Sequence, residues 1–160
     1  MEITIGHILA FAGAALSVIL AGLGSVKGVA DAGAAAAGVI AEDPGKFGQV
    51  LPLQILPSTQ GLYGLITAFL ILLKVGMFEG ELVNLTLNQG FLFLAASLPI
   101  SIIGFVSAIY QGKLAAASIG IVAKRPKEFA KGMVLTAMVE TFAVFAVLAS
   151  LLMVLFGIKI

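Results

Sequence analysis

Cysteine and tryptophan are absent from the 160-residue sequence, and histidine occurs only once. The lack of cysteine excludes disulfides, thiolate metal sites and iron–sulfur clusters within the chain. The single histidine excludes a metal centre built from several histidines of one chain. Because no cysteine is present, the sequence gives no information on the redox compartment.

Charge is also scarce. Only 11% of the residues are charged, whereas a soluble domain usually has about a quarter. Nine basic side chains against eight acidic ones leave a formal net charge of +1. This balance excludes both a nucleic-acid-binding protein that works through a basic surface and an acidic tail. A phosphate-binding Gly-Lys-Ser/Thr loop is missing too, so we expect the chain to be no enzyme by itself and not to hydrolyse ATP.

Apolar residues take the place of the missing charge: 61% of the residues are hydrophobic, and 19 more are glycine. A soluble chain of this length cannot bury so much apolar surface in one core. A transmembrane helix needs roughly 20 apolar residues, and four sufficiently long runs follow one another, separated by short polar breaks. These runs are Ile5–Val29, Val50–Val75, Phe91–Val122 and Met133–Phe156. The sequence therefore predicts an all-α membrane protein with four transmembrane helices.

The basic residues indicate the orientation. They gather in the third polar break, 124–131, and Lys46 lies in the first, 42–48, whereas the middle break around Glu79 and Glu81 has none. Cytoplasmic loops of membrane proteins carry an excess of Lys and Arg. We therefore expect an integral, multi-pass protein whose turns 42–48 and 124–131 are cytoplasmic, with both termini outside.

The chain also contains an internal repeat, because a shift of 82 residues overlays it on itself without a gap. The two cytoplasmic turns match best, with Pro44 on Pro126 and Phe47 on Phe129. Composition alone can align two alanine-rich helices, but it does not explain a shared Pro and Phe in both turns. We therefore predict two duplicated helical hairpins, residues 1–82 and 83–160, in parallel orientation.

Small residues line the first and third apolar runs, including a small-xxx-small spacing at Gly24 and Gly28. Such residues let helices approach closely in lipid, where no hydrophobic force drives helices together. Ordinary packing within one chain explains them. The alternative is that the first and third helices of several chains crowd together in the inner circle of a ring.

Glu140 is the most distinctive residue, because it lies well inside the fourth apolar run. A lone acid at this depth is expensive and usually functional; the alternative is a structural acid satisfied by a neighbouring hydroxyl. Glu140 lies about 21 Å after Pro126 along a helix, and Gln111 roughly 22 Å before it. Antiparallel neighbours therefore have these two side chains at one depth. The repeat brings Thr59 and Gln60 to this level too.

This layer suits a monovalent cation. Hard cations prefer oxygen ligands, and one carboxylate with the neutral oxygens of Gln60, Gln111 and Thr59 gives a site of zero net charge around Na+. A divalent ion would leave a charge of +1 in a low dielectric. A proton needs only a carboxylate with a raised pKa, and each Gln can also serve as an ordinary interhelical hydrogen-bond partner. Pro57 predicts that the second helix is disturbed beside the polar layer. Tyr63 lies one turn beyond Thr59 on the same helix, within hydrogen-bonding reach of the layer.

The segments Ile55–Gly64, Tyr110–Lys113 and Met138–Phe142 resemble those of the proteolipid (c-type or K) subunit of V-type ATPases, in particular the bacterial sodium-translocating enzymes. The resemblance covers essentially the whole chain. It implies a ring of identical subunits in the membrane sector of a rotary motor, in a bacterial plasma membrane, with Na+ as the carried ion and no organic cofactor. The implied ligands are Glu140, Gln111, Thr59, Gln60 and the Leu56 carbonyl, with Tyr63 locking Glu140 from outside the ligand shell.

The family also implies partners: a stator membrane subunit (a or I type) whose arginine faces Glu140, a central-stalk connector at the cytoplasmic loops, and membrane lipid. Ser58 departs from the Gly that close relatives often have in the same motif. Three alternatives remain open at this point: a rotor that carries H+, a stand-alone small ion transporter, and a purely structural proteolipid.

Overall fold

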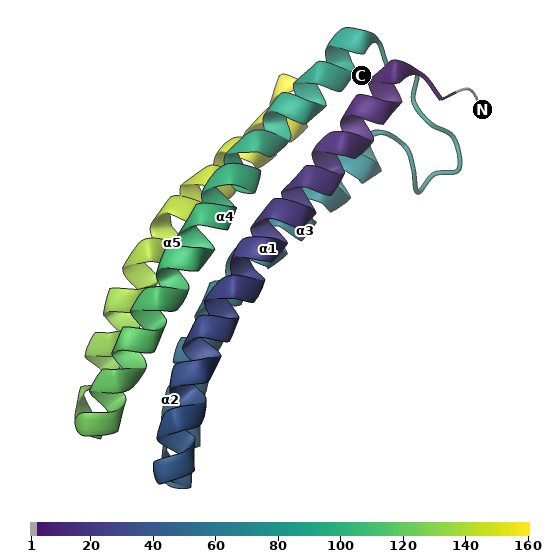
Figure 1. Ribbon diagram of the computed structural model, residues 1–160. Helices are drawn as coiled ribbons and strands as arrows, with labels where there is room; N and C mark the ends of the chain where they lie inside the picture. The colour runs from purple at the N-terminus through teal and green to yellow at the C-terminus, as the bar shows by residue number, and fades with distance from the viewer. Residues whose placement is uncertain (1–2) are drawn as a thin grey trace.

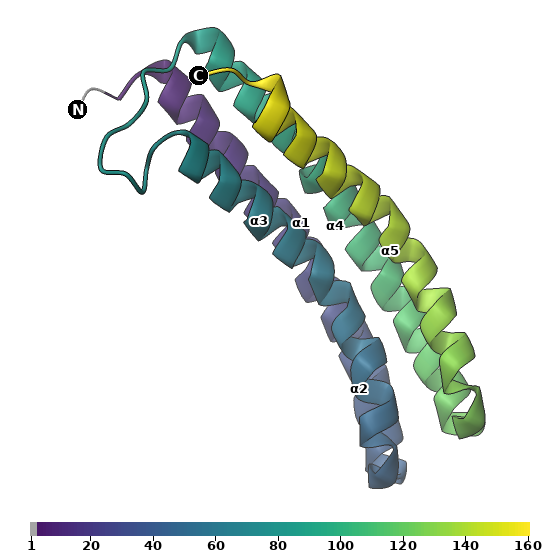
Figure 2. The same cartoon turned by 180° about the vertical axis from the view of Figure 1, so that it is seen from behind.

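The computed structural model describes residues 3–160, and within that range the secondary structure is helical throughout, with no strand. Two helical hairpins lie side by side in an elongated, gently curved bundle (Figure 1). The first hairpin contains α1 (Ile5–Glu42), α2 (Phe47–Ile55) and α3 (Thr59–Lys74); the second contains α4 (Leu87–Lys124) and α5 (Phe129–Leu152). Figure 2 shows the bundle from behind, with α3 and α5 in front of α1 and α4.

Four segments of the described chain are long and apolar enough to cross a membrane, which confirms the predicted fold class. They are Ile5–Glu42, Pro44–Lys74, Leu87–Lys124 and Pro126–Gly157. Both turns between the helices of a hairpin lie at one end of the bundle, and the connection 75–86 lies at the other end, beside the start of α1 and the C-terminus (Figure 1). The antiparallel pairing expected from the depth argument is therefore present.

The repeat extends to the ends of the helices. Thr4 caps α1 and Thr86 caps α4, and the third residue of each helix, His7 or Gln89, accepts a hydrogen bond from the N–H of the capping threonine, at 3.0 Å and 2.9 Å. Capping boxes of this kind satisfy the free N–H groups of a helix start. A 3-10 turn follows each long helix, at Pro44–Lys46 and at Pro126–Glu128. All these features recur at an interval of 82 residues.

One element breaks this symmetry. Proline at position 57 has no N–H and disturbs the preceding turn, and the second span changes there from α-helix to a 3-10 turn, Leu56–Ser58, before α3 begins. The equivalent residues of the second hairpin include Glu140 and lie within an uninterrupted α5. The predicted disturbance beside the polar layer is therefore present in the first hairpin alone.

Glycines hold the two hairpins together. A Cβ added to Gly112 of α4 would lie 2.2 Å from the Cα of Gly28, and one added to Gly90 would lie 2.6 Å from the Cα of Gly6. Real Cβ atoms essentially never come so close, so α1 and α4 touch backbone to backbone in the manner of small-residue interfaces in membranes. This contact fixes the depth of α3 and α5 relative to each other.

The connection between the hairpins is tied down by backbone and side-chain bonds. Gly76, with φ +82°, ends α3, and the N–H groups of Gly76 and Met77 donate to Leu73 and Leu72, which is the pattern of a Schellman motif. His7 Nε2 lies 2.9 Å from the Val83 carbonyl oxygen. The single histidine therefore joins the start of α1 to the connection.

Candidate ion-binding site

Glu140 meets two carboxamides at the middle of the bundle. Its Oε2 accepts hydrogen bonds from Gln111 Nε2 at 2.8 Å and from Gln60 Nε2 at 3.2 Å. The two glutamines also bind each other, with Gln60 Nε2 donating to Gln111 Oε1 at 2.7 Å. Both glutamine side chains are fully buried. The structure thus brings together the three residues that the depth argument placed at one level.

Three different helices supply these groups: Gln60 comes from the start of α3, Gln111 from α4 and Glu140 from α5. Gln60 is the second residue after the 3-10 turn at Pro57, so the disturbed turn sets where its side chain enters the bundle. The close contact between α1 and α4 brings α3 near α5. One chain therefore supplies all three groups, and they span the contact between the hairpins.

The other Glu140 oxygen, Oε1, is buried and has no hydrogen-bond partner among the described residues. An unsatisfied buried polar atom is costly, and a carboxylate inside an apolar bundle is costlier still. A cation or a proton would offset this cost. Residues 3–160 hold no group of three or more His, Cys, Asp or Glu side chains, so neutral oxygens are the other ligands that the chain offers here.

Thr59 and the Leu56 carbonyl lie beside this layer. The Thr59 hydroxyl donates a hydrogen bond to the Leu56 carbonyl oxygen at 2.9 Å. The same hydroxyl lies 3.3 Å from Gln60 Oε1. Tyr63 interacts with Glu140 from the next turn of α3 and packs against Ile100 and its neighbours on α4 and α5. Thr59 is thus linked to Glu140 through Gln60, and the Leu56 carbonyl is linked through Thr59.

Two residues outside that set also bind the glutamines. Ser107 Oγ accepts from Gln60 Nε2 at 3.3 Å and donates to the Val139 carbonyl at 3.1 Å, while Gln111 Nε2 donates to the Thr136 carbonyl at 3.2 Å. The sequence held one signal for Ser107, since it matches Ser25 in the repeat. The contact of Thr136 goes through its backbone, which no sequence pattern reveals.

A duplicated transmembrane hairpin with one carboxylate held by carboxamides at mid-depth defines a membrane proteolipid. The chain belongs to the ATP synthase C-subunit family, whose sequence model matches residues 12–71 and, again, residues 94–153. These two ranges are separated by the same 82 residues as the repeat, and they confirm the predicted resemblance.

Two relatives support this assignment. The chain is 47% identical over 150 residues to the V-type sodium ATPase subunit K of Enterococcus hirae, covering 94% of this chain and 92% of that protein. It is 43% identical over 146 residues to the A-type ATP synthase subunit K of Methanocaldococcus jannaschii, covering 91% of this chain and 61% of that protein. Both relatives are named as subunit K, one of a V-type sodium ATPase and the other of an A-type ATP synthase.

Proposed function

We propose that this chain is a rotor-ring subunit of a membrane rotary ATPase and that it carries Na+ across the membrane on Glu140. The arrangement of Glu140 between Gln60 and Gln111, inside an apolar bundle, is the main observation behind this proposal. The sodium ATPase subunit from Enterococcus supports Na+ as the ion. ATP hydrolysis belongs to other subunits of the complex, and the chain contributes no catalytic residue of its own.

The carboxamides can serve the site with and without its ion. In the structure their Nε2 groups point at Glu140 and stabilise its negative charge through charge-assisted hydrogen bonds. A Gln side chain also has an acceptor oxygen, so a rotation of each amide turns an oxygen toward a cation bound at Glu140. Thr59 and the Leu56 carbonyl add two further neutral oxygens, and the loaded site has no net charge.

The neutrality of the loaded site explains how the ring can carry the ion past the lipid as it rotates. A neutral site can face lipid, whereas a bare carboxylate there is expensive. In the proposed complex, an arginine on the stator membrane subunit pairs with Glu140 and releases the ion into an aqueous path. A central-stalk connector bound at the turns 42–48 and 124–131 transmits the torque. Tyr63, packed beside Glu140, holds the carboxylate in place between these events.

The test is modification of Glu140 by a hydrophobic carbodiimide at neutral pH in membranes that contain the assembled complex. We expect Na+ to slow the modification and an equal concentration of K+ to leave it unchanged, with Glu140→Gln as the unlabelled control. Equal rates with and without Na+ would identify the ion as H+. Full ATP-driven transport by Glu140→Gln would contradict the carrier role and leave a structural proteolipid. Transport by the purified chain alone would contradict the rotor.

A further inference from the structure

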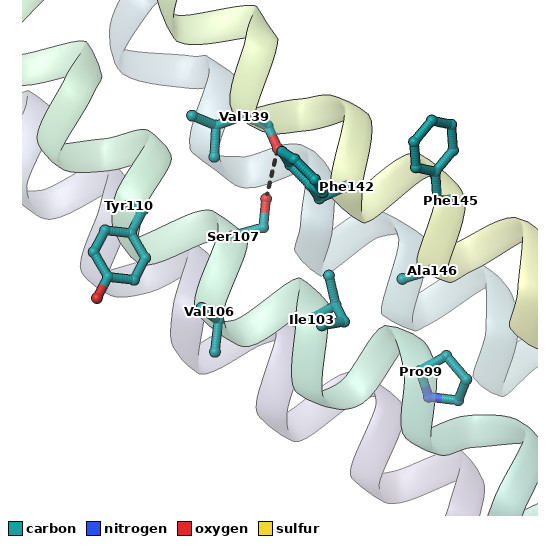
Figure 3. Close-up of a pocket in the computed structure, with 9 residues that line it drawn as sticks. All are labelled: Pro99, Ile103, Val106, Ser107, Tyr110, Val139, Phe142, Phe145 and Ala146. Atoms are coloured by element: carbon teal, nitrogen blue, oxygen red, sulfur yellow. Dashed lines mark hydrogen bonds between the residues drawn. The ribbon is translucent and has the colours of Figure 1, made fainter.

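Ser107 of α4 lies at the edge of the ion site and has no part in the proposed ligand set. Its hydroxyl donates to the carbonyl of Val139, the residue before Glu140, at 3.1 Å, and Figure 3 shows this bond between α4 and α5. Its Oγ also accepts from Gln60 Nε2 at 3.3 Å. Ser107 therefore joins a carboxamide of α3 to the backbone beside the carboxylate, and the ligand set gives no reason for this link.

The surroundings of Ser107 provide no substitute for its hydroxyl. Its side chain is buried and lines an apolar groove of about 480 Å³ between α4 and α5. Apart from Tyr110, the other described residues that line this groove are apolar. Tyr110 is 59% exposed, and in Figure 3 its hydroxyl points away from Ser107. Loss of the serine hydroxyl would therefore not be compensated from the groove.

The two carboxamides of the site differ in how their hydrogens are used. The Nε2 atom of a glutamine carries two hydrogens. Gln111 Nε2 has one acceptor for each of them, Glu140 Oε2 and the Thr136 carbonyl. Gln60 Nε2, in contrast, has three oxygens within hydrogen-bonding distance. These are Gln111 Oε1 at 2.7 Å, Glu140 Oε2 at 3.2 Å and Ser107 Oγ at 3.3 Å. Gln60 thus has one acceptor more than it has hydrogens.

The two amides also differ in what a rotation costs. Turning the Gln111 amide over brings its oxygen against the Thr136 carbonyl, which can only accept, so a hydrogen bond is lost. Turning the Gln60 amide over brings its oxygen to Ser107, whose hydroxyl can donate as well as accept because it rotates about the Cβ–Oγ bond. The Gln60 Nε2 then takes the place of Oε1, which lies 3.3 Å from the Thr59 hydroxyl. Gln60 is therefore the amide that can turn over with both of its ends still bonded.

A bound cation decides between the two orientations of Gln60. With Nε2 toward the layer, Gln60 donates to Gln111 Oε1 and to the Glu140 carboxylate. With the amide turned over, its oxygen faces these same two oxygens. Oxygens that face one another repel unless a cation lies between them, and hard cations prefer such an oxygen shell. The first orientation stabilises the carboxylate before the ion enters, and the second suits the loaded site.

We propose that Ser107 is a positioning residue for ion loading: its hydroxyl accepts from Gln60 Nε2 before the ion binds and donates to Gln60 Oε1 afterwards. The hydroxyl leaves the Val139 carbonyl when it reverses, and this carbonyl lies within α5, where the helix supplies another donor. Ser107 does not touch the ion. The inference rests on the proposed function for the ion, and it adds the group that lets Gln60 present its oxygen without losing a hydrogen bond.

Ser107→Ala tests this reversal in membranes that hold the assembled complex. Before the ion binds, Gln60 Nε2 keeps two acceptors for its two hydrogens, so carbodiimide should modify Glu140 at the wild-type rate when Na+ is absent. In the loaded site Gln60 Oε1 loses its donor. The Na+ concentration that half-protects Glu140 should therefore rise about three- to tenfold, the effect of one hydrogen bond. Ser107→Thr keeps the hydroxyl, and the groove has room for its methyl group, so it should restore the wild-type Na+ requirement.

Ser118→Ala is the matched control, because Ser118 is also buried on α4 and its Oγ lies 3.1 Å from Thr136 Oγ1 of α5. This variant removes a comparable bond between the two helices and should leave the Na+ requirement unchanged. The inference is overturned if Ser107→Ala leaves the Na+ requirement unchanged, if Ser118→Ala raises it equally, or if Ser107→Thr does not restore it. A rate without Na+ that changes as much as the Na+ requirement also overturns it, since Ser107 would then only hold the α5 backbone. Failure of Na+ to protect Glu140 in the wild type would instead contradict the proposed function.

Discussion

At the scale of single residues, Gln111 binds both the carboxylate and the backbone of α5. Its Nε2 donates to Glu140 and to the Thr136 carbonyl, and its Oε1 accepts from Gln60. It therefore orients the carboxylate and links α4 to α5; the proposed function adds its oxygen to the ligands of the ion. These roles separate it from Thr59, whose hydroxyl is directed to the Leu56 carbonyl.

Replacing Gln111 by Leu keeps most of its volume and removes all of these polar contacts. We expect the Na+ concentration that half-protects Glu140 from carbodiimide to rise at least tenfold, which corresponds to about 1.4 kcal/mol. Gln89→Leu is the control, because Gln89 caps α4 far from the site. An unchanged Na+ requirement in Gln111→Leu would remove Gln111 from the proposed ligand set.

Part of this site could be predicted from the sequence, because helix geometry fixes depth. Counting residues from Pro126 placed Gln111 at the depth of Glu140, the repeat placed Gln60 there too, and the structure brings all three together. The sequence could not supply the direction of the Thr59 hydroxyl, which depends on the Leu56 carbonyl at the break around Pro57. Nor could it supply the contacts of Ser107 and Thr136, which depend on rotamers and on backbone carbonyls of α5. The role of each residue as a sodium ligand stays a prediction.

At the scale of elements, the contact between α1 and α4 decides the geometry. A Cβ on Gly28 would lie 2.3 Å from the Ala108 carbonyl oxygen and 2.7 Å from the Pro57 Cβ. The added methyl group would thus press on α4 and on the turn that positions Gln60. Gly28 therefore couples the packing of the two hairpins to the shape of the proposed ion site.

Gly28→Ala should accordingly destabilise the chain by about 1–3 kcal/mol, the usual cost of overpacking a tight interface, and should weaken Na+ protection of Glu140. Gly22→Ala is the matched control on the same helix, because a Cβ there meets nothing within 4 Å. The measurement is the temperature at which the protein in mild detergent loses its native oligomer. Similar midpoints for the two variants would show that the α1–α4 contact is looser than described.

Element boundaries were partly predictable. The repeat and the apolar runs predicted four long helices, and the short turns at Pro44 and Pro126 appear where the polar breaks placed them. The structure at the end of α5 could not be predicted in this way. There a π-helical turn, Met153–Gly157, leaves the Val154 and Leu155 carbonyls to accept from Lys74 Nζ at 2.8 Å and 3.0 Å. This tie between the two hairpins arises only in three dimensions.

At the scale of the whole molecule, the two ends of the bundle differ in charge. The end with the turns carries Lys46, Lys124, Arg125 and their basic neighbours, with Lys46 Nζ reaching the Ala123 carbonyl of the other hairpin at 2.9 Å. The opposite end contains the connection 75–86 and its acidic residues Glu79 and Glu81. This asymmetry predicts that the turns lie in the cytoplasm and the connection outside.

The orientation can be measured with an impermeant maleimide, because the native chain lacks cysteine. Lys127→Cys lies in the exposed second turn, and Glu79→Cys lies in the exposed connection at the other end. We expect the reagent to label position 79 in intact cells and position 127 only in inverted membrane vesicles. The reversed pattern would place the basic turns outside, where neither a cytoplasmic stalk nor an ATP-hydrolysing head could reach them, and would contradict the proposed coupling of ring rotation to ATP hydrolysis. The label pattern therefore tests the orientation on which the rotor mechanism depends, independently of which ion Glu140 carries.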